Sequence, residues 1–123
     1  MSKKIVMVIT NDPQFSYLMQ SYISASGWQM QVSSRENNNL VDFIQKVKPK
    51  VIVIDTDDGG LIPLTLLKSL RSEKTLNNLP IVICSWLEDK IHAWRDSRSI
   101  LLNKPVLYGD FQRILLEIGI DPD

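Results

Sequence analysis

Val51-Ile52-Val53-Ile54-Asp55 is the stretch of sequence that decides the fold. Four β-branched apolar residues in a row are typical of a strand buried on both faces, as the central strands of parallel sheets are. The run ends on a carboxylate, so the pattern places Asp55 at the carboxyl end of a buried strand. In open α/β sheets ligands and chemistry are found at that edge, because the loops leaving the strands form a crevice there.

Apolar runs and amphipathic segments alternate along the rest of the chain. Strands are expected at 5–9, at 28–32 as a half-exposed edge, at 81–85 and at 100–103. Helices are expected from Asp12-Pro13 to Gly27, at 40–47, at 61–70, at 87–95 and at 111–119, with a polar connection at 71–80. Five strands that alternate with helices predict an α/β fold, with a parallel sheet covered by helices on both faces.

The composition of the chain excludes several classes of protein. The chain of 123 residues has the length of one domain, 1–123, and its 14 basic and 14 acidic residues cancel. This balance argues against nucleic acid or an anionic membrane as a direct partner. One cysteine, Cys84, excludes an internal disulfide, and the apolar run near the N-terminus is too short to span a bilayer. These features predict a cytoplasmic protein.

Polar residues follow four of the predicted strands: Thr10-Asn11-Asp12, Asp55, Ser85 and Lys104. Because parallel strands end at the same edge, these groups should converge in one crevice. A carboxylate beside a lysine and a hydroxyl suits phosphoryl chemistry: the carboxylate oxygen attacks phosphorus, and Mg²⁺ offsets the accumulating charge. The alternative is that each polar residue simply meets solvent at a strand end.

The order of these motifs resembles a known family. Asp12-Pro13-Gln14-Phe15, Gly27-Trp28, 49–55, 79–85 and Asn103-Lys104-Pro105 are similar to the receiver domain of bacterial response regulators along essentially the whole chain. The resemblance implies a flavodoxin-like sheet ordered 2-1-3-4-5 and a role in two-component signalling. It makes Asp55 the phospho-acceptor and Ser85 and Lys104 the residues that contact the phosphoryl group. It also implies a cis Lys104–Pro105 bond.

The chain departs from the family at the magnesium site. The acidic pair that holds Mg²⁺ in receivers falls on Thr10 and Asn11, and neither is charged. Asn11, Asp12, Asp55 and Asp57 are the candidate metal ligands that remain, with Asp12 one position late and expected to cap the first helix. Mg²⁺ binding is therefore expected to be weakened.

Two further departures concern the switch that the family uses. Trp86 stands where a small residue normally follows the hydroxyl residue, so its indole is expected to crowd the phosphoryl pocket. Leu101 stands where many receivers carry a switch aromatic. Trp86, Trp94 and Tyr108 are candidates for one exposed aromatic interaction surface, with core packing as the alternative for each.

Three functions stay open from sequence. A working receiver would take a phosphoryl group on Asp55 from a histidine kinase or phosphotransfer protein and switch its binding to a downstream protein partner. A degenerate receiver would act as an interaction module without phosphate. Asp55-Thr56-Asp57 with Ser85 and Lys104 also resembles the motifs of haloacid-dehalogenase-type phosphatases, but the expected second acidic pair is missing, so an enzyme is disfavoured. Homodimer formation, as in many receivers, is left open.

Overall fold

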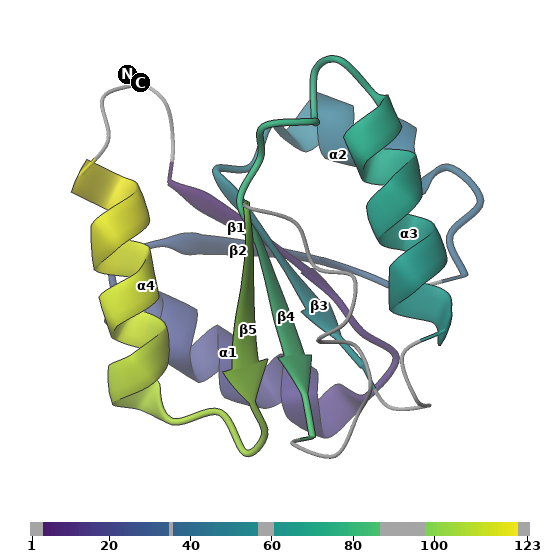
Figure 1. Cartoon of the computed structure of the whole chain (residues 1–123). Coiled ribbons are helices and arrows are strands. Elements are labelled where there is room, and N and C mark those ends of the chain that lie inside the picture. Colours follow the sequence, from purple (N-terminus) through teal and green to yellow (C-terminus); the bar gives the residue numbers. More distant parts are fainter. Residues whose placement is uncertain (1–3, 35, 57–60, 87–97, 121–123) are drawn as a thin grey trace.

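The computed structural model describes residues 4–34, 36–56, 61–86 and 98–120. Five strands form one parallel sheet in the order β2-β1-β3-β4-β5 (Figure 1). The strands are β1 (Ile5–Ile9), β2 (Gln29–Ser33), β3 (Val51–Asp55), β4 (Ile81–Ser85) and β5 (Ser99–Asn103). The α/β class and the strand order expected from sequence are confirmed.

Helices cover both faces of the sheet. In the described ranges they are α1 (Pro13–Ala25), α2 (Leu40–Val47), α3 (Leu61–Ser72) and α4 (Tyr108–Ile120). α1 and α4 pack on one face, and α2 and α3 pack on the other (Figure 1). The helix predicted at 87–95 lies outside the described residues. None of the helices described is both long enough and apolar enough to cross a membrane.

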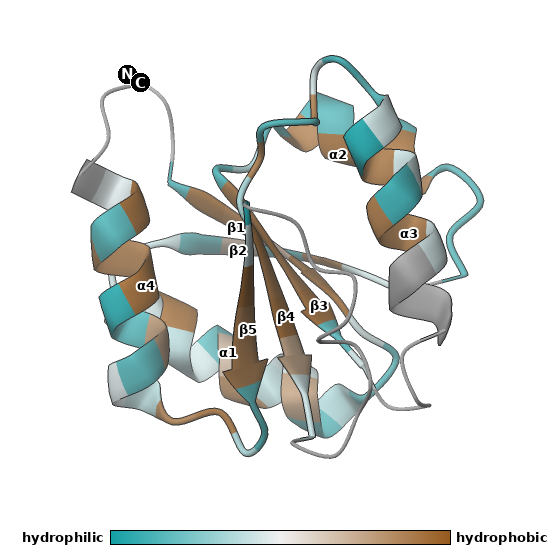
Figure 2. Cartoon of the chain, viewed as in Figure 1, coloured by the Kyte–Doolittle hydropathy of each residue, from teal (hydrophilic) through white to brown (hydrophobic). Residues whose placement is uncertain are grey.

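The two faces of the sheet carry side chains of different size. Alternate residues of a strand point to opposite faces, and here the alternation separates smaller residues from larger ones. The α1/α4 face carries Val6, Val8, Val51, Val53, Val82 and Cys84. The α2/α3 face carries Met7, Ile9, Ile52, Ile54, Ile81 and Ile83. Rings from the helices, including Phe15 and Phe111, pack in the same cluster as the smaller residues. The apolar strands are brown in Figure 2.

Local sequence signals fix the first helix. The Asp12 carboxylate accepts a hydrogen bond from the Gln14 N–H at 2.9 Å, and Pro13 occupies the first turn, where no N–H is needed. Gly27 follows the helix with φ of +80°, a conformation that favours glycine. These predictions of the helix start and stop are confirmed. The start of this helix matters because Thr10 and Phe15, which lie on either side of the Asp12 cap, both reach the candidate site.

Two predictions about the second half of the chain are wrong in part. The connection after α3 is not wholly polar, because Leu76 is buried in the α2/α3 core. The Arg71 guanidinium also holds this connection, since it donates to the carbonyl oxygens of Asn77 at 3.2 Å and Leu79 at 2.6 Å. Leu76 and Leu79 are the two leucines of this polar stretch, which is too few to give a periodic signal. The apolar run at 100–102 predicts a buried strand, but β5 is only half-buried, since it pairs with β4 alone at the edge of the sheet.

Candidate functional site

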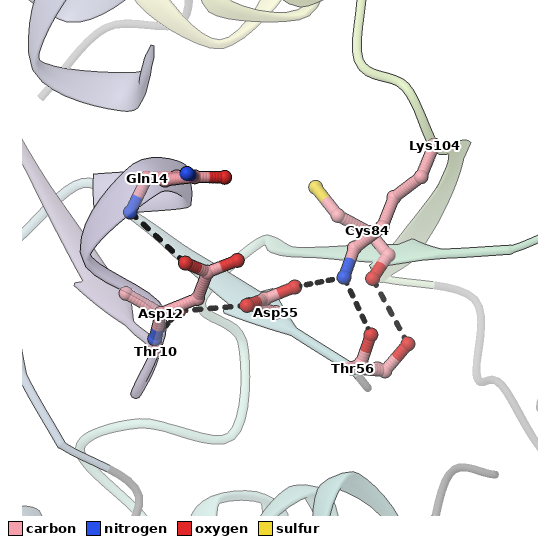
Figure 3. Close-up of polar contacts among 7 residues, drawn as sticks. All are labelled: Thr10, Asp12, Gln14, Asp55, Thr56, Cys84 and Lys104. Atoms are coloured by element: carbon pink, nitrogen blue, oxygen red, sulfur yellow. Dashed lines mark hydrogen bonds and ion pairs between the residues drawn. The ribbon is translucent and has the colours of Figure 1, made fainter. Parts of the chain in front are cut away.

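Asp55 lies at the end of β3 with its side chain only 2% exposed. The hydroxyl of Thr10, which directly follows the neighbouring strand β1, donates to Asp55 Oδ2 at 2.7 Å. The same hydroxyl oxygen accepts from the Asp12 N–H at 3.0 Å (Figure 3). Thr10 therefore connects the carboxylate to the N-terminus of α1, and one oxygen of Asp55 is engaged from within the chain.

Lys104 engages the other carboxylate oxygen. Its ammonium forms an ion pair with Asp55 Oδ1 and donates to the Thr56 carbonyl oxygen at 2.6 Å (Figure 3). The backbone N–H of Lys104 extends the pairing of β5 with β4 by donating to the Ser85 carbonyl at 2.8 Å. The Lys104–Pro105 peptide is cis, as the resemblance implied. The Lys104 side chain is 10% exposed, so both members of the pair are largely removed from water.

Hydrogen bonds between Thr56 and Cys84 connect the two strands β3 and β4 at this ion pair. The N–H and the hydroxyl of Thr56 each donate to the Cys84 carbonyl at 3.0 Å, which ties the chain after β3 to β4. Burial, and secondarily the charge of Asp55, raise the pKa of the Cys84 thiol to about 12, against the smaller opposing effect of Lys104. Cys84 is therefore a neutral core residue.

Ser85 completes the group of residues at this edge. Its side chain is fully buried at the end of β4, and its hydroxyl has no hydrogen-bond partner within the part of the chain described. Buried hydroxyls are usually paired, but the Ser85 hydroxyl is a donor without a partner among the described residues, at the strand end that also carries the Lys104 backbone contact. The convergence of Asp55, Ser85 and Lys104 on one edge follows the sequence argument. We call these three residues with Thr10 and Thr56 the Asp55 site.

Three of the candidate magnesium ligands, Asn11, Asp12 and Asp55, have other partners among the described residues. The Asn11 side-chain amide donates to both oxygens of Glu36, at 2.7 and 2.6 Å, and Asp12 caps α1 from an exposed position. Both oxygens of Asp55 are already held. Among the residues described, no three His, Cys, Asp or Glu side chains are grouped as metal ligands. Asp57, the fourth candidate ligand, lies outside the described residues.

The aromatic candidates lie in different surroundings. The Tyr108 ring packs on Tyr22 between α4 and α1, with ring centroids 5.3 Å apart, and is half-buried. Trp86 is 44% exposed and lies near Lys104 instead, with 5.8 Å between the ammonium and the ring centroid. Trp94 lies outside the described residues. A common surface of all three rings therefore stays a prediction.

Three residues of the site carried no clear signal in the sequence. Thr10 was expected only to mark the position of a missing acid, and its hydrogen bond to Asp55 depends on the register of β1 against β3. Thr56 was read only as part of an acidic motif, although its carbonyl binds Lys104. Phe15 was named only as part of the motif after the first strand, yet its ring centroid lies 5.4 Å from the Lys104 ammonium. Only the folded geometry brings these groups together.

Comparison with solved structures gives consistent matches to one kind of domain. The signal receiver domain of a signal transduction histidine kinase from Syntrophus aciditrophicus has a TM-score of 0.81 at 13% identity, over 98% of this chain and 94% of that one. A response regulator receiver domain from Bermanella marisrubri gives 0.76 at 17% identity, over 96% and 99%. The chain has the receiver-domain fold.

Another match shows what this fold holds elsewhere. The receiver domain of a sensor histidine kinase from Pseudomonas aeruginosa, at 16% identity and a TM-score of 0.73 over 96% of this chain and 99% of that one, carries a magnesium ion in its active-site cleft. No protein-family model matches this chain, and no curated protein matches it by sequence. These comparisons therefore show a shared fold.

Proposed function

We propose that this protein is a receiver-fold signalling module that acts through contacts with other proteins and does not depend on Mg²⁺-assisted phosphorylation of Asp55. The observation that carries the proposal is the internal engagement of Asp55: Thr10 donates to one carboxylate oxygen, and Lys104 pairs with the other. Its partners would be proteins of two-component signalling, such as a histidine kinase or a phosphotransfer protein.

The charge balance of the Asp55 site supports this function. The carboxylate and the ammonium cancel, so the pair offers no excess negative charge to attract Mg²⁺. An acyl phosphate on Asp55 would carry about two negative charges against the single positive charge of Lys104. Without a metal ion to offset the difference, a net negative charge would lie in a site that is nearly closed to water, which is unfavourable.

Attack on phosphorus uses a lone pair of a carboxylate oxygen. In this structure the hydrogen bond from Thr10 and the ion pair with Lys104 stabilise the charge on the two oxygens of Asp55, which makes each a weaker nucleophile. The resting arrangement is therefore complementary to an unmodified Asp55. The phosphatase alternative has less support, because the second acidic pair that it requires is missing from the sequence and the folds that match are signalling domains.

A second candidate function, a phospho-accepting switch, is favoured by one observation. The Ser85 hydroxyl is buried beside the Asp55–Lys104 pair and lacks a partner among the described groups. A phosphoryl oxygen on Asp55 would supply one. In this function the lysine and the hydroxyl would hold the phosphoryl group, and a downstream partner would read the change.

Incubation with a small phosphodonor and Mg²⁺, followed by intact mass measurement, separates the two functions. We expect no gain of a phosphoryl group in the wild type. The Thr10→Asp/Asn11→Asp variant, which restores two acids after β1, is the positive control and should gain one. Asp55→Asn is the negative control. A mass gain in the wild type that Asp55→Asn abolishes would overturn the proposed function and leave the phospho-accepting switch.

A further inference from the structure

Two aromatic rings flank the Lys104 ammonium. The Phe15 centroid lies 5.4 Å from Nζ and the Trp86 centroid 5.8 Å from it, both within the range of about 6 Å over which a ring attracts a cation. The Asp55 carboxylate and the Thr56 carbonyl contact the same ammonium. The cation therefore has two charged or polar partners and two aromatic partners.

The two rings come from separate elements of the fold and differ in exposure. Phe15 belongs to α1, is 7% exposed and is fixed by the core on the α1/α4 face. Trp86 directly follows β4 and is 44% exposed. Both line a surface hollow of about 200 Å³, together with Gln14, Leu18, Lys104 and Pro105. The indole is thus a part of the Lys104 environment that solvent or a partner can reach.

Aromatic rings beside an ammonium restrict the positions that a lysine side chain adopts. A lysine ammonium is strongly hydrated and sits on a flexible chain. Aromatic walls replace part of its water shell and attract it through their negative faces. They also lower the local dielectric constant, which strengthens the attraction between the ammonium and Asp55.

We propose that Phe15 and Trp86 are positioning residues that form an aromatic clamp on Lys104 and hold its ammonium against Asp55. The clamp deepens the proposed function, on which it rests, because it explains how the Asp55 site stays engaged without a metal ion. It also gives the site a route to the surface: a protein that covers or moves the Trp86 indole changes the environment of the Asp55–Lys104 pair.

This route differs from the one that the family resemblance implied. The position of the family's switch aromatic is Leu101, whose side chain packs with the α2/α3 core on the opposite face of the sheet from Phe15. Trp86 directly follows the neighbouring strand β4, and its ring centroid lies 5.8 Å from the Lys104 ammonium. In the proposed clamp, the aromatic side chain that couples the site to the surface therefore follows β4.

The ammonium protons of Lys104 provide a direct test. Protons of a solvent-exposed lysine ammonium exchange with water too fast to observe by NMR at neutral pH, whereas those of a buried, hydrogen-bonded ammonium exchange more slowly. In full-length protein labelled with ¹⁵N-lysine, we expect an observable Lys104 signal, assigned by its loss in Lys104→Arg. Ring currents should also shift the Lys104 Hε resonances upfield.

Three variants and one control decide the outcome. Trp86→Ala and Phe15→Leu should lose the ammonium signal and the upfield shift while keeping a folded backbone spectrum, and Trp86→Phe should restore both. Trp28→Phe is the matched control, because the Trp28 ring also lies 5.8 Å from a lysine, Lys4, which is exposed. It should leave the Lys104 signal unchanged. Should Phe15→Leu fail to fold, the more exposed Trp86→Ala decides alone.

Two results would overturn the clamp: no protected Lys104 signal in the wild type, or a signal and shift that persist in folded Trp86→Ala. Neither result depends on phosphorylation. The mass measurement with a phosphodonor reports on the proposed function separately. A wild type that gains a phosphoryl group and still shows the Trp86-dependent signal would refute the proposed function and keep the clamp.

Discussion

Replacement of Lys104 by methionine should strongly destabilise the fold. The change removes the ammonium and leaves Asp55, 2% exposed, as a buried charge with the Thr10 hydroxyl as its remaining hydrogen-bond donor among the described residues. Removal of one partner from a buried ion pair costs about 3–5 kcal/mol. For a chain of 123 residues, 1 kcal/mol corresponds to roughly 4 °C in Tm. Lys104→Met should therefore lower Tm by about 12–20 °C.

Removal of both charges should recover most of this loss. Asp55→Asn alone leaves the Lys104 ammonium, 10% exposed, without its carboxylate and should also be destabilising. The double variant Asp55→Asn/Lys104→Met contains no buried charge at this position, and neutral replacement of a whole pair costs little. We expect a coupling free energy of at least about 2 kcal/mol between the two residues in a double-mutant cycle.

The assay is urea unfolding of the four proteins, with the free energy of unfolding extrapolated to water and the m values compared. The sign of the Asp55→Asn effect is decisive. In a site with excess negative charge, loss of one carboxylate relieves repulsion and stabilises the fold. An Asp55→Asn variant more stable than the wild type, or a coupling free energy near zero, would refute the view that Asp55 and Lys104 are a neutral, mutually dependent pair.

Other features of the structure give further predictions. Thr10→Val should lower the free energy of unfolding by about 1–3 kcal/mol, because the Asp55 oxygen and the Asp12 N–H each lose a partner, whereas Thr10→Ser should stay near the wild type in the same urea assay; equal stability of Val and Ser variants would contradict this. The Cys84 thiol has its pKa raised from 9.0 to about 12 in the folded chain, so its stabilising effect is complete below pH 9 and is lost as pH rises towards 12, at up to about 1.4 kcal/mol per pH unit. Cys84→Ala should lack this part of the alkaline loss of stability, and identical pH slopes in unfolding measurements would argue against it. Arg71→Met should speed hydrogen exchange at 73–79, because the guanidinium donates to carbonyl oxygens of this loop; unchanged exchange there would exclude the role.

The sequence predicted the fold well because its signals are local. Val51 to Ile54 and Ile81 to Cys84 are apolar at every position. Such continuous apolar runs are typical of strands that are buried on both faces. Helix α1 was predicted through its cap and its glycine stop. The burial of Leu76 was not predicted, because it results from a tertiary contact with the α2/α3 core. The residues around Leu76 have no periodic apolar pattern that would indicate this contact.

The site could be predicted only to the level of strand ends. Parallel topology alone brings Asp55, Ser85 and Lys104 to the same edge, and the structure places them there. The hydrogen bond from Thr10 depends on side-chain geometry and on strand register, and the position of Phe15 beside Lys104 depends on how α1 packs. A sequence pattern fixes neither of these quantities. The absence of acids at Thr10 and Asn11 was visible from sequence, but what replaces them was not.

The measurement that tests the account most directly is thermal unfolding of the wild type and of Asp55→Asn across a range of Mg²⁺ concentrations, with Thr10→Asp/Asn11→Asp as the positive control. A ligand that binds only the folded state stabilises it in proportion to the logarithm of its concentration above Kd, about 2.7 kcal/mol at one hundred times Kd. Because Thr10 and Lys104 already hold both oxygens of Asp55, we expect the wild type and Asp55→Asn to respond equally, and the double-acid variant alone to gain stability. A rise in wild-type Tm with Mg²⁺ that Asp55→Asn abolishes would contradict the account.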